Sequence, residues 1–341
     1  MKKGRFAPSP TGRMHLGNVF CALLSWLSAK SGGGEWLLRI EDLDPQRSKK
    51  DYALQLMDDL QWLGLPWDGE PVWQSQRGNI YEEYLQRLTD MGLTYPCYCT
   101  RADIMATQAP HETDGRVVYK GTCRPKDVIL DAENDVADTA RVPTAINHIS
   151  PSIEGGVGVG LATTRLIVPD CTIPFTDGHY GRHDINLAEH CGDYIIRRKD
   201  GAWAYQLAVV VDDALMSVTE IVRGRDLLLS SPQQIHLREL LFGERKTENG
   251  FAHPSTVNLQ RSTLTFLHHP LLCNAEGQRL CKRDKSMDLG YLRDKGTTPQ
   301  EIIGLLAYYA GLIEQAYSAN PEELLTLFSW NKVPTEDIIT L

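Results

Sequence analysis

The chain has 341 residues, of which 42% are hydrophobic and 23% charged, and its 44 acidic residues outnumber 35 Lys and Arg to give a formal net charge of −9. This length can bury more than one core without disulfides or metals, which excludes a disulfide mini-scaffold, and the mixed composition excludes a fibre or a disordered chain. The acidic balance argues against a protein that coats nucleic acid indiscriminately, although one basic surface could still bind it.

The N-terminus contains no targeting pattern. Pro8 and Pro10 interrupt the basic segment 1–7 before any apolar run begins, so we expect no secretory signal. No window approaches the ~18 consecutive apolar residues that would span a bilayer. We therefore predict a cytoplasmic protein that is not attached to a membrane. Because cytosolic thiols stay reduced, the eight cysteines are expected to be core residues or metal ligands.

The first 41 residues predict a strand, a helix and a second strand. Residues 2–7 form the first strand, apolar positions recur at helical spacing over 18–30, and a glycine run ends that pattern. Residues 35–40 form the second strand, with Glu41 just beyond its end. In such units ligands bind where strands end and helices begin, so this side is the predicted ligand side.

The middle of the chain contains helices and then an irregular stretch. Amphipathic helices are predicted at 51–65 and 76–91, before a cysteine-bearing segment at 95–124. Residues 130–162 lose periodicity, and their Gly-Val-Gly-Val-Gly run has no strand before it and no helix after it. We interpret this stretch as a flexible insertion and not as a phosphate-binding loop.

The second half predicts further strands before a helical tail. Beyond Ser230 helical patterns dominate, and the acidic residues after Ser286 make the tail a poor RNA-binding surface. Strands are predicted at 165–168, 193–198 and 219–222. The segment 205–214 could be either a strand or a helix.

The string RFAPSPTGRMHLGN, residues 5–18, offers a phosphate site. His15 and Asn18 fall at a predicted helix N-terminus, where free N–H groups and the helix dipole favour an anion, and Gly17 lets a ligand approach the backbone closely. A lone histidine at this position is more often a cap. An HxGN string that opens the first helix of a parallel α/β domain nevertheless indicates nucleotide binding.

A basic loop, Arg279-Leu-Cys-Lys-Arg-Asp-Lys-Ser286, is the second candidate. Lys282 and Lys285, next to a hydroxyl, can neutralise a triphosphate whose charge rises as pyrophosphate leaves. In isolation such a loop is more often a solvated surface loop. Together with the motif around His15 it predicts an ATP site.

Three cysteines suggest a metal. Cys97, Cys99 and Cys123 suit a tetrahedral zinc site that lacks one protein ligand. The chemistry alone leaves His111, Tyr119 or water as the fourth ligand, and histidine is the commoner donor. The alternative is that the three are ordinary core cysteines.

Glu41, Tyr205 and Arg223 form a looser set, in which each residue is expected to follow a strand and to face the crevice at the strand ends. Arg223 could hold a carboxylate through two hydrogen bonds, and Glu41 could hold an ammonium group. Spacing alone does not distinguish this set from surface ion pairs.

Four strings of this sequence, taken together, resemble class I aminoacyl-tRNA synthetases of the glutamate branch. The matching strings are RFAPSPTG…HLGN, LLRIEDLDPQR, AYQLAVVVDD…VTEIVRGRDLL and LCKRDKS, which run with gaps from Arg5 to about Leu312. The resemblance implies an α/β fold, a Rossmann-like doubly wound parallel sheet with a zinc-bearing insertion and a helical C-terminal region. The implied divisions are the first half of the catalytic domain at 1–94, the insertion at 95–165, the second half at 166–240, and a helical stem-contact region with the basic loop at 241–341.

Within this branch the chain is more similar to the short glutamyl-queuosine tRNA(Asp) synthetases than to full-length glutamyl-tRNA synthetases. The stretch after Ser286 is shorter than the anticodon-binding domain of the full-length enzymes, so we expect none. In the short enzymes the zinc pattern is CxC followed by Tyr-x-x-x-Cys, which Tyr119 and Cys123 match. The resemblance thus favours Tyr119 over His111 as the fourth ligand. Asn18 stands where many class I enzymes have a second histidine.

The resemblance implies activation of L-glutamate by ATP, with Mg²⁺ on the phosphates, and transfer to queuosine in the anticodon of tRNA(Asp). It implies catalytic roles for His15, Asn18, Lys282 and Lys285 and ATP contacts for His15, Gly17, Asn18 and Lys285. The implied glutamate-binding residues are Arg5, Ala7, Ser9, Glu41, Tyr205 and Arg223.

Two other functions stay open, and we expect a monomer in each case. One is a truncated or divergent glutamyl-tRNA synthetase that charges tRNA(Glu). The other is a non-catalytic, synthetase-derived RNA-binding module, although the residues whose loss would mark such a module are present.

Overall fold

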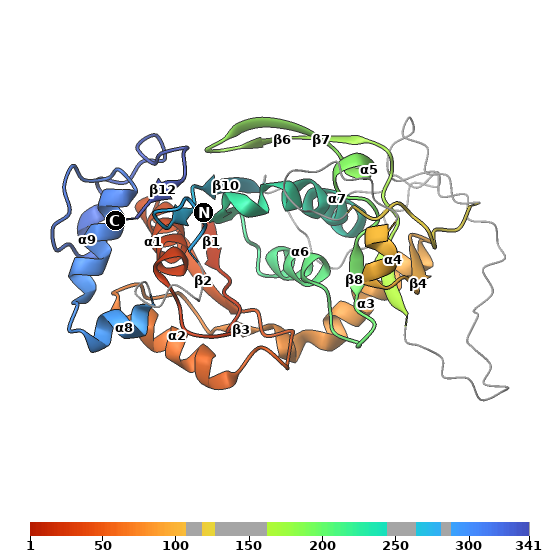
Figure 1. Ribbon diagram of the computed structural model, residues 1–341, viewed down its shortest axis with the longest axis horizontal. Coiled ribbons are helices and arrows are strands. Elements are labelled where there is room, and N and C mark those ends of the chain that lie inside the picture. Colours follow the sequence, from red (N-terminus) through yellow and green to blue (C-terminus); the bar gives the residue numbers. More distant parts are fainter. Residues whose placement is uncertain (107–117, 127–161, 244–263, 281–287, 341) are drawn as a thin grey trace.

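The protein was analysed as a computed structural model that describes residues 1–106, 118–126, 162–243, 264–280 and 288–340. Figure 1 shows an elongated molecule in which strands inside are flanked by helices. Among these residues no helix is both long and apolar enough to cross a bilayer. Several of the residues discussed above lie outside the described ones, namely most of the insertion at 130–162, His111, Lys282 and Lys285.

The N-terminal strand, helix and strand form as expected. Parallel strands β1 (Lys3–Phe6), β2 (Glu35–Ile40) and β3 (Val72–Trp73) pair in that order. Helix α1 (Leu16–Ser31) connects β1 to β2, and its apolar residues, such as Leu23, are fully buried against the strands. The sheet edge and the first helix are thus joined by one hydrophobic core, which fixes the N-terminus of α1 relative to the end of β1.

Two later strands complete the parallel arrangement. Strand β9 (Glu220–Gly224) pairs in parallel with β10 (Thr265–His269). Strand β9 also lies beside β1, where the Thr219 backbone N–H donates to the Lys3 carbonyl at 2.9 Å. The resulting spatial order is β3-β2-β1-β9-β10. From β1 the chain proceeds outward through β2 and β3 on one side and later through β9 and β10 on the other. The boundary between β1 and β9 is therefore the switch point, where doubly wound sheets bind ligands. The predicted Rossmann-like fold is confirmed.

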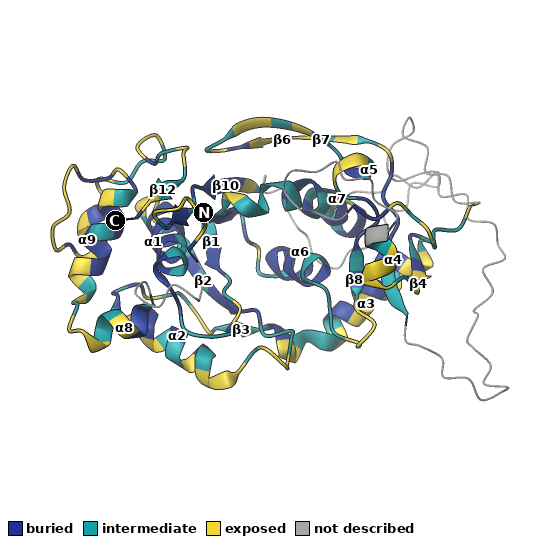
Figure 2. Ribbon diagram, viewed as in Figure 1, coloured by how far each residue is buried: buried dark blue, intermediate teal, exposed yellow. Residues whose placement is uncertain are grey.

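A hairpin extends the second half of the sheet. Strands β6 (Thr172–Asp177) and β7 (Gly181–Asn186) are antiparallel, and β6 joins β10 where Asp177 is opposite Phe266. Figure 2 shows that exposed and partly buried residues make up nearly all of this hairpin. Asp177 and Ile185 are buried, with relative exposures of 1% and 7%.

Helices surround the sheet in two groups. Helices α3 (Gly78–Asp90), α6 (Tyr205–Leu215) and α7 (Ser231–Phe242) share a second core. Helix α9 (Pro299–Tyr309) and short α10 (Pro321–Leu324) pack against α1 near the C-terminus. The remaining helical elements are α2 (Lys50–Trp62), η1 (Gln74–Arg77), α4 (Arg101–Ala106), α5 (Leu187–His190), η2 (Arg225–Ser230) and α8 (Leu289–Asp294).

Beyond Ser230 the expectation that helices dominate is wrong in one important place, because β10 lies inside the parallel sheet. A strand buried on both faces is a short apolar run with no alternation, which periodicity cannot distinguish from a buried helix turn. The pair β11 (Leu272–Cys273) and β12 (Ile338–Ile339) was also missed, and each strand has two residues. The ambiguous segment 205–214 is helical, so Tyr205 opens α6 and does not follow a strand.

A small antiparallel sheet carries the cysteine-bearing segment. Strands β4 (Thr94–Cys97), β5 (Thr163–Leu166) and β8 (Ile195–Arg197) pair in that order. Tyr119 is bridged to Gly192 beside this sheet, which brings the segment 118–126 close to β4.

Candidate active site

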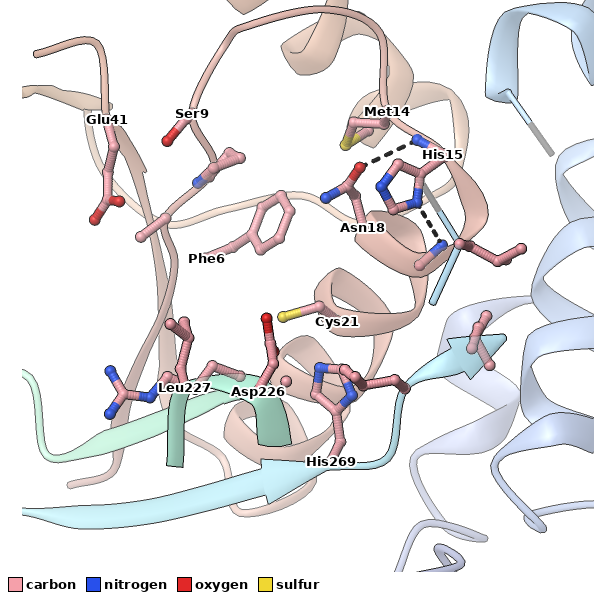
Figure 3. A pocket seen from close by; sticks show the side chains of 18 of the residues that line it. Phe6, Ser9, Met14, His15, Asn18, Cys21, Glu41, Asp226, Leu227 and His269 are labelled. Carbon is pink, nitrogen blue, oxygen red and sulfur yellow. Dashed lines mark hydrogen bonds between the residues drawn. The ribbon is translucent and has the colours of Figure 1, made fainter. Parts of the chain in front are cut away.

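A pocket of about 470 Å³ opens at the carboxyl ends of β1 and β9, at the switch point of the sheet. Figure 3 shows side chains from β1, α1 and β10 converging on it. Lys282 and Lys285 lie outside the described residues. All the other residues expected to bind ATP or glutamate line the pocket, namely Arg5, Ala7, Ser9, His15, Gly17, Asn18, Glu41, Tyr205 and Arg223.

The N-terminus of α1 is closed by its own side chains. His15 is the N-cap, and its Nδ1 accepts from the Gly17 N–H at 3.1 Å, while Asn18 Oδ1 accepts from the His15 N–H at 3.1 Å (Figure 3). Because Nδ1 is an acceptor, the neutral ring has its proton on Nε2. A Cβ on Gly17 would lie 2.9 Å from Cε1 of His15, so this glycine leaves room for the imidazole.

The two described ends of the basic loop meet this helix start. Leu280 and Arg279 line the pocket on one side of the loop. On the other side the Leu289 N–H donates to the Met14 carbonyl at 3.0 Å, and Asp288 is bridged to His15. Arg279 also pairs with Asp226, which follows β9. Both ends of the loop are therefore anchored at the pocket.

The part of the pocket around Arg5 and Glu41 contains a buried charge network. Arg5 Nε donates to Asp213 Oδ1 at 3.2 Å, and Arg39 donates to the same oxygen at 2.6 Å and to Glu41 Oε1 at 3.1 Å. Burial raises the pKa of Glu41, and the charges of Arg39 and Arg5 offset only part of this effect. The network holds Arg5 and Glu41 in place from behind, because Arg39 is fully buried.

Arg223 is held by its own set of acceptors. Nη1 donates to Gln234 Oε1 at 2.7 Å, Nη2 donates to Ser231 Oγ at 2.8 Å, and Nε donates to His268 Nε2 at 3.0 Å. Burial lowers the pKa of Arg223, and the nearby Tyr205 hydroxyl offsets part of this effect.

Two further pocket residues are neutral near pH 7. Burial lowers the pKa of His269 to about 4 and raises the pKa of Cys21 to about 12. An imidazole and a thiol with such values serve neither as a charged acid nor as a thiolate nucleophile at neutral pH. The pocket thus provides fixed charges and hydrogen bonds more than acid–base groups.

Several residues that support the site were not predicted from the sequence. Asp213 and Arg39 are polar residues inside otherwise apolar runs, and His268 follows the apolar start of β10. A charged residue inside an apolar run is a signal of a buried pair, and it could have been used. The missed residues include Cys21, Arg39, Asp177, Asp213, Asp226, Ser231, Gln234, His268 and His269.

The three cysteines do come together. The Sγ atoms of Cys97, Cys99 and Cys123 all lie within 4.8 Å of one another, and those of Cys99 and Cys123 are 3.4 Å apart. Tetrahedral zinc with ~2.3 Å bonds would place its sulfurs about 3.8 Å apart, so this group could hold a metal ion. Burial alone would raise the pKa of Cys123, but hydrogen bonds from the Tyr98 backbone and Tyr119 lower it to about 7.

Tyr119 lies at the same group. Its hydroxyl oxygen is 3.4 Å from Cys97 Sγ and 3.8 Å from Cys99 Sγ, and it accepts from the Cys123 N–H at 2.7 Å. The Arg165 guanidinium lies 3.8 Å from the centre of the Tyr119 ring. The chemistry of the four side chains therefore fits the predicted donor set, whereas His111 lies outside the described residues.

Comparison with known proteins gives a family. The family model "tRNA synthetases class I (E and Q), catalytic domain" matches residues 3–140 and 159–331. Two curated relatives are named Glutamyl-Q tRNA(Asp) synthetase. The one from Nitratidesulfovibrio vulgaris is 38% identical, with 100% of this chain and 96% of the relative covered. The one from Symbiobacterium thermophilum is 40% identical, with 98% and 94% covered.

Solved structures agree in fold. The crystal structure of a glutamate tRNA ligase from Elizabethkingia meningosepticum in complex with its amino acid is 25% identical, with a TM-score of 0.69. It covers 97% of this chain, and this chain spans 65% of the ligase chain. The chain belongs to the class I tRNA synthetases of the E and Q branch, in the group whose curated members are named Glutamyl-Q tRNA(Asp) synthetase.

Proposed function

We propose that this protein activates L-glutamate with ATP and transfers the glutamyl group to queuosine in the anticodon of tRNA(Asp). The observation that carries the proposal is that the start of α1 and both ends of the basic loop meet at one pocket that also contains Arg5, Glu41 and Arg223. A nucleotide site and a site for a charged amino acid are therefore adjacent.

On the nucleotide side, the N-terminus of α1 would face the phosphates of ATP. Backbone N–H groups and the helix dipole favour anions there, and the Nε2–H of His15 and the amide of Asn18 add donors. Lys282 and Lys285 would close over the phosphates from the loop. Magnesium would arrive bound to ATP, where it neutralises phosphate charge.

On the amino-acid side, the two guanidinium groups suit the carboxylates of glutamate and Glu41 suits its ammonium group. Ala7, Ser9 and Tyr205 complete this wall. An oxygen of the α-carboxylate then attacks the α-phosphorus, the bond to the leaving pyrophosphate breaks, and glutamyl-adenylate forms. The protein contributes orientation and charge stabilisation, which are the main terms in such transfers.

The choice of the tRNA that accepts the glutamyl group rests on sequence similarity. Identities of 38–40% connect the chain to relatives named for queuosine tRNA(Asp), against 25% for the glutamate tRNA ligase. The TM-score of 0.69 with that ligase keeps charging of tRNA(Glu) as a second candidate.

The test supplies the protein with labelled glutamate, ATP and purified tRNA(Asp) with queuosine, tRNA(Asp) without it, or tRNA(Glu). We expect label only on the queuosine-containing tRNA(Asp), and ribonuclease mapping should place it on the anticodon fragment. Label at the 3′ end of tRNA(Glu) would establish the second candidate. An absence of glutamate-dependent ATP–pyrophosphate exchange under every condition would identify the non-catalytic RNA-binding module.

We further propose that Cys97, Cys99, Cys123 and Tyr119 hold a structural zinc ion. Zinc there would fasten segment 118–126 to β4, and it would take no part in the chemical steps. The division at 1–94, 95–165, 166–240 and 241–341 also stays a proposal, with β10 contributed by the last of these segments.

We propose a cytoplasmic location. There the seven cysteines within the described residues would stay reduced. The monomeric state stays a prediction.

A further inference from the structure

Behind Arg223 lies a line of buried side chains that the mechanism above does not use. His268, on β10, accepts from Arg223 Nε at 3.0 Å, and its other ring nitrogen, Nδ1, lies 2.6 Å from Asp177 Oδ2. The side chains of His268 and Asp177 have relative exposures of 0%. Three strands, β9, β10 and β6, thus each contribute one member of the line.

The geometry determines where the imidazole proton lies. A guanidinium can only donate, so Nε2 of His268 must be an acceptor and cannot have a hydrogen. Nδ1 therefore has the ring proton and donates it to Asp177. Burial lowers the pKa of His268 despite the hydrogen bond with Asp177, which agrees with a neutral ring.

This arrangement constrains the guanidinium plane. Ser231 and Gln234 hold the two Nη nitrogens, and the face of the group lies 5.3 Å from the centre of the Phe266 ring. His268 holds the third nitrogen, Nε, so the group cannot rotate about its long axis. Bidentate binding of a carboxylate needs such a fixed plane.

We infer that Asp177 and His268 are positioning residues, which hold Arg223 in the orientation that binds a carboxylate of the amino-acid substrate. The inference rests on the proposed function, in which that substrate is glutamate. Neither residue touches the substrate. Asp177 sets the tautomer of His268, and His268 then presents a lone pair to Arg223. A carboxylate that fixes a histidine tautomer is an established way to orient a functional group.

Three substitutions separate the two hydrogen bonds. His268→Asn keeps a donor for Asp177 but removes the acceptor for Arg223, whereas His268→Gln keeps an acceptor near Nε2 and loses the bond to Asp177. Asp177→Asn leaves an oxygen for the His179 and Tyr180 N–H groups, which Oδ1 now accepts at 3.0 and 2.9 Å. Its amide group would face Nδ1 and drive the ring proton to Nε2, against the donor of Arg223.

The measurement is steady-state ATP–pyrophosphate exchange with purified full-length protein. We expect His268→Asn and Asp177→Asn to raise the KM for glutamate about tenfold or more, because each removes or inverts a hydrogen bond to a charged group. The KM for ATP and kcat should change less than about threefold. His268→Gln should restore most of the glutamate affinity. His236→Asn, which alters another buried histidine, on α7, should leave the glutamate KM unchanged.

Nitrogen-15 NMR of histidine-labelled protein gives a readout that general destabilisation would not move. The His268 signal, assigned by its loss in His268→Gln, should show the Nδ1–H tautomer in the wild type and the Nε2–H tautomer in Asp177→Asn. An unchanged glutamate KM in both His268→Asn and Asp177→Asn, in a wild type that is active with glutamate, would overturn the inference alone. Absence of glutamate-dependent exchange in the wild type would overturn the proposed function as well.

Discussion

The backbone N–H of Leu289 donates to the carbonyl oxygen of Met14 at 3.0 Å, across more than 270 residues of sequence. Leu289 opens α8 just after the basic loop, and Met14 precedes the N-cap of α1. Because this bond places the residue that follows the loop beside the helix start, it supports the proposal that the loop and the helix act on the same ligand. The first prediction tests that proposal.

Replacing Lys285 should slow glutamate activation without weakening glutamate binding. The charge that develops on the leaving pyrophosphate would lose a cationic partner, and the loss of one such group costs about 100-fold in kcat. Lys285→Ala should show this fall in ATP–pyrophosphate exchange, while calorimetry shows unchanged glutamate affinity. Lys295→Ala, just after α8, is the matched control and should retain wild-type rates. A decrease of less than threefold in Lys285→Ala would contradict the role given to the loop.

Gly17→Ala should weaken ATP binding. The added Cβ would lie 2.9 Å from Cε1 and 3.0 Å from Nδ1 of His15, so the imidazole must move from its cap position. We expect the KM for ATP to rise about tenfold, roughly the value of one charge-assisted hydrogen bond. Gly32→Ala changes the other end of the same helix, where the nearest atom would be 3.8 Å away, and should have little effect. Equal KM values for ATP in the two variants would refute this explanation.

The α1 region shows what could be predicted from sequence. The structure of residues 5–18 can be predicted from neighbouring residues alone, because a strand, a proline turn and a helix cap follow one another directly. The structure places His15 at the cap as expected. His268 contains no such signal. Its role depends on Asp177, 91 residues away, and on a strand whose apolar run does not distinguish a helix from a central strand. Pairings at long sequence separation between buried polar residues follow from topology, and one sequence does not reveal them.

The same reasoning applies to Glu41 and Arg223. The sequence predicts both at the crevice on the expectation that each follows a strand, a rule that needs only the order of elements. Glu41 does follow β2, whereas Arg223 lies inside β9, one residue before that strand ends. The buried partners that orient them, Arg39 and Gln234, come from the interior of β2 and from α7. A pattern based on strand ends finds residues that face a ligand but misses those that hold them from behind.

Glutamate binding should depend on pH through Glu41. Burial raises the pKa of this carboxyl above its ordinary value of about 4.3, and only its ionised form can bind an ammonium group. Glutamate affinity measured by calorimetry should therefore fall as the pH decreases through that raised pKa. Glu41→Gln should bind glutamate weakly and lose this part of the pH dependence. The same pH dependence of glutamate affinity in the wild type and in Glu41→Gln would contradict the assignment.

Asp337 should stabilise the fold near the pocket. It accepts from Arg225 Nε and Nη2, both at 2.5 Å, and from the Leu271 N–H at 2.8 Å, which ties the C-terminal segment to η2 and to the loop after β10. Asp337→Asn should lower the free energy of unfolding by about 1 kcal/mol, a modest value because Arg225 is partly exposed. Chemical denaturation checks this, with exposed Glu336→Gln as the control.

The pH dependence of that difference has a definite sign. Burial would raise the pKa of Asp337, but the hydrogen bonds from Arg225 and Leu271 hold it below the ordinary value. The unfolded chain therefore binds more protons in acid, so the stabilisation is present above the ordinary pKa and disappears as the pH falls through the lower, folded value. Wild type and Asp337→Asn should converge in stability at low pH. A difference that grows in acid would exclude this ion pair as its source.

The cysteine group yields the last prediction, which concerns the fourth ligand. Cys99→Ser removes a thiolate, so the purified protein should contain less than half the wild-type zinc, measured by elemental analysis. Tyr119→Phe keeps the ring under the Arg165 guanidinium and removes only the hydroxyl that lies 3.4 Å from Cys97 Sγ. If that oxygen is a ligand, the variant should lose zinc to a competing chelator at least about tenfold more readily. Cys171→Ser, a free thiol outside the group, controls for the handling of thiols. Wild-type zinc affinity in Tyr119→Phe would remove Tyr119 from the donor set and return water or His111 to the fourth position.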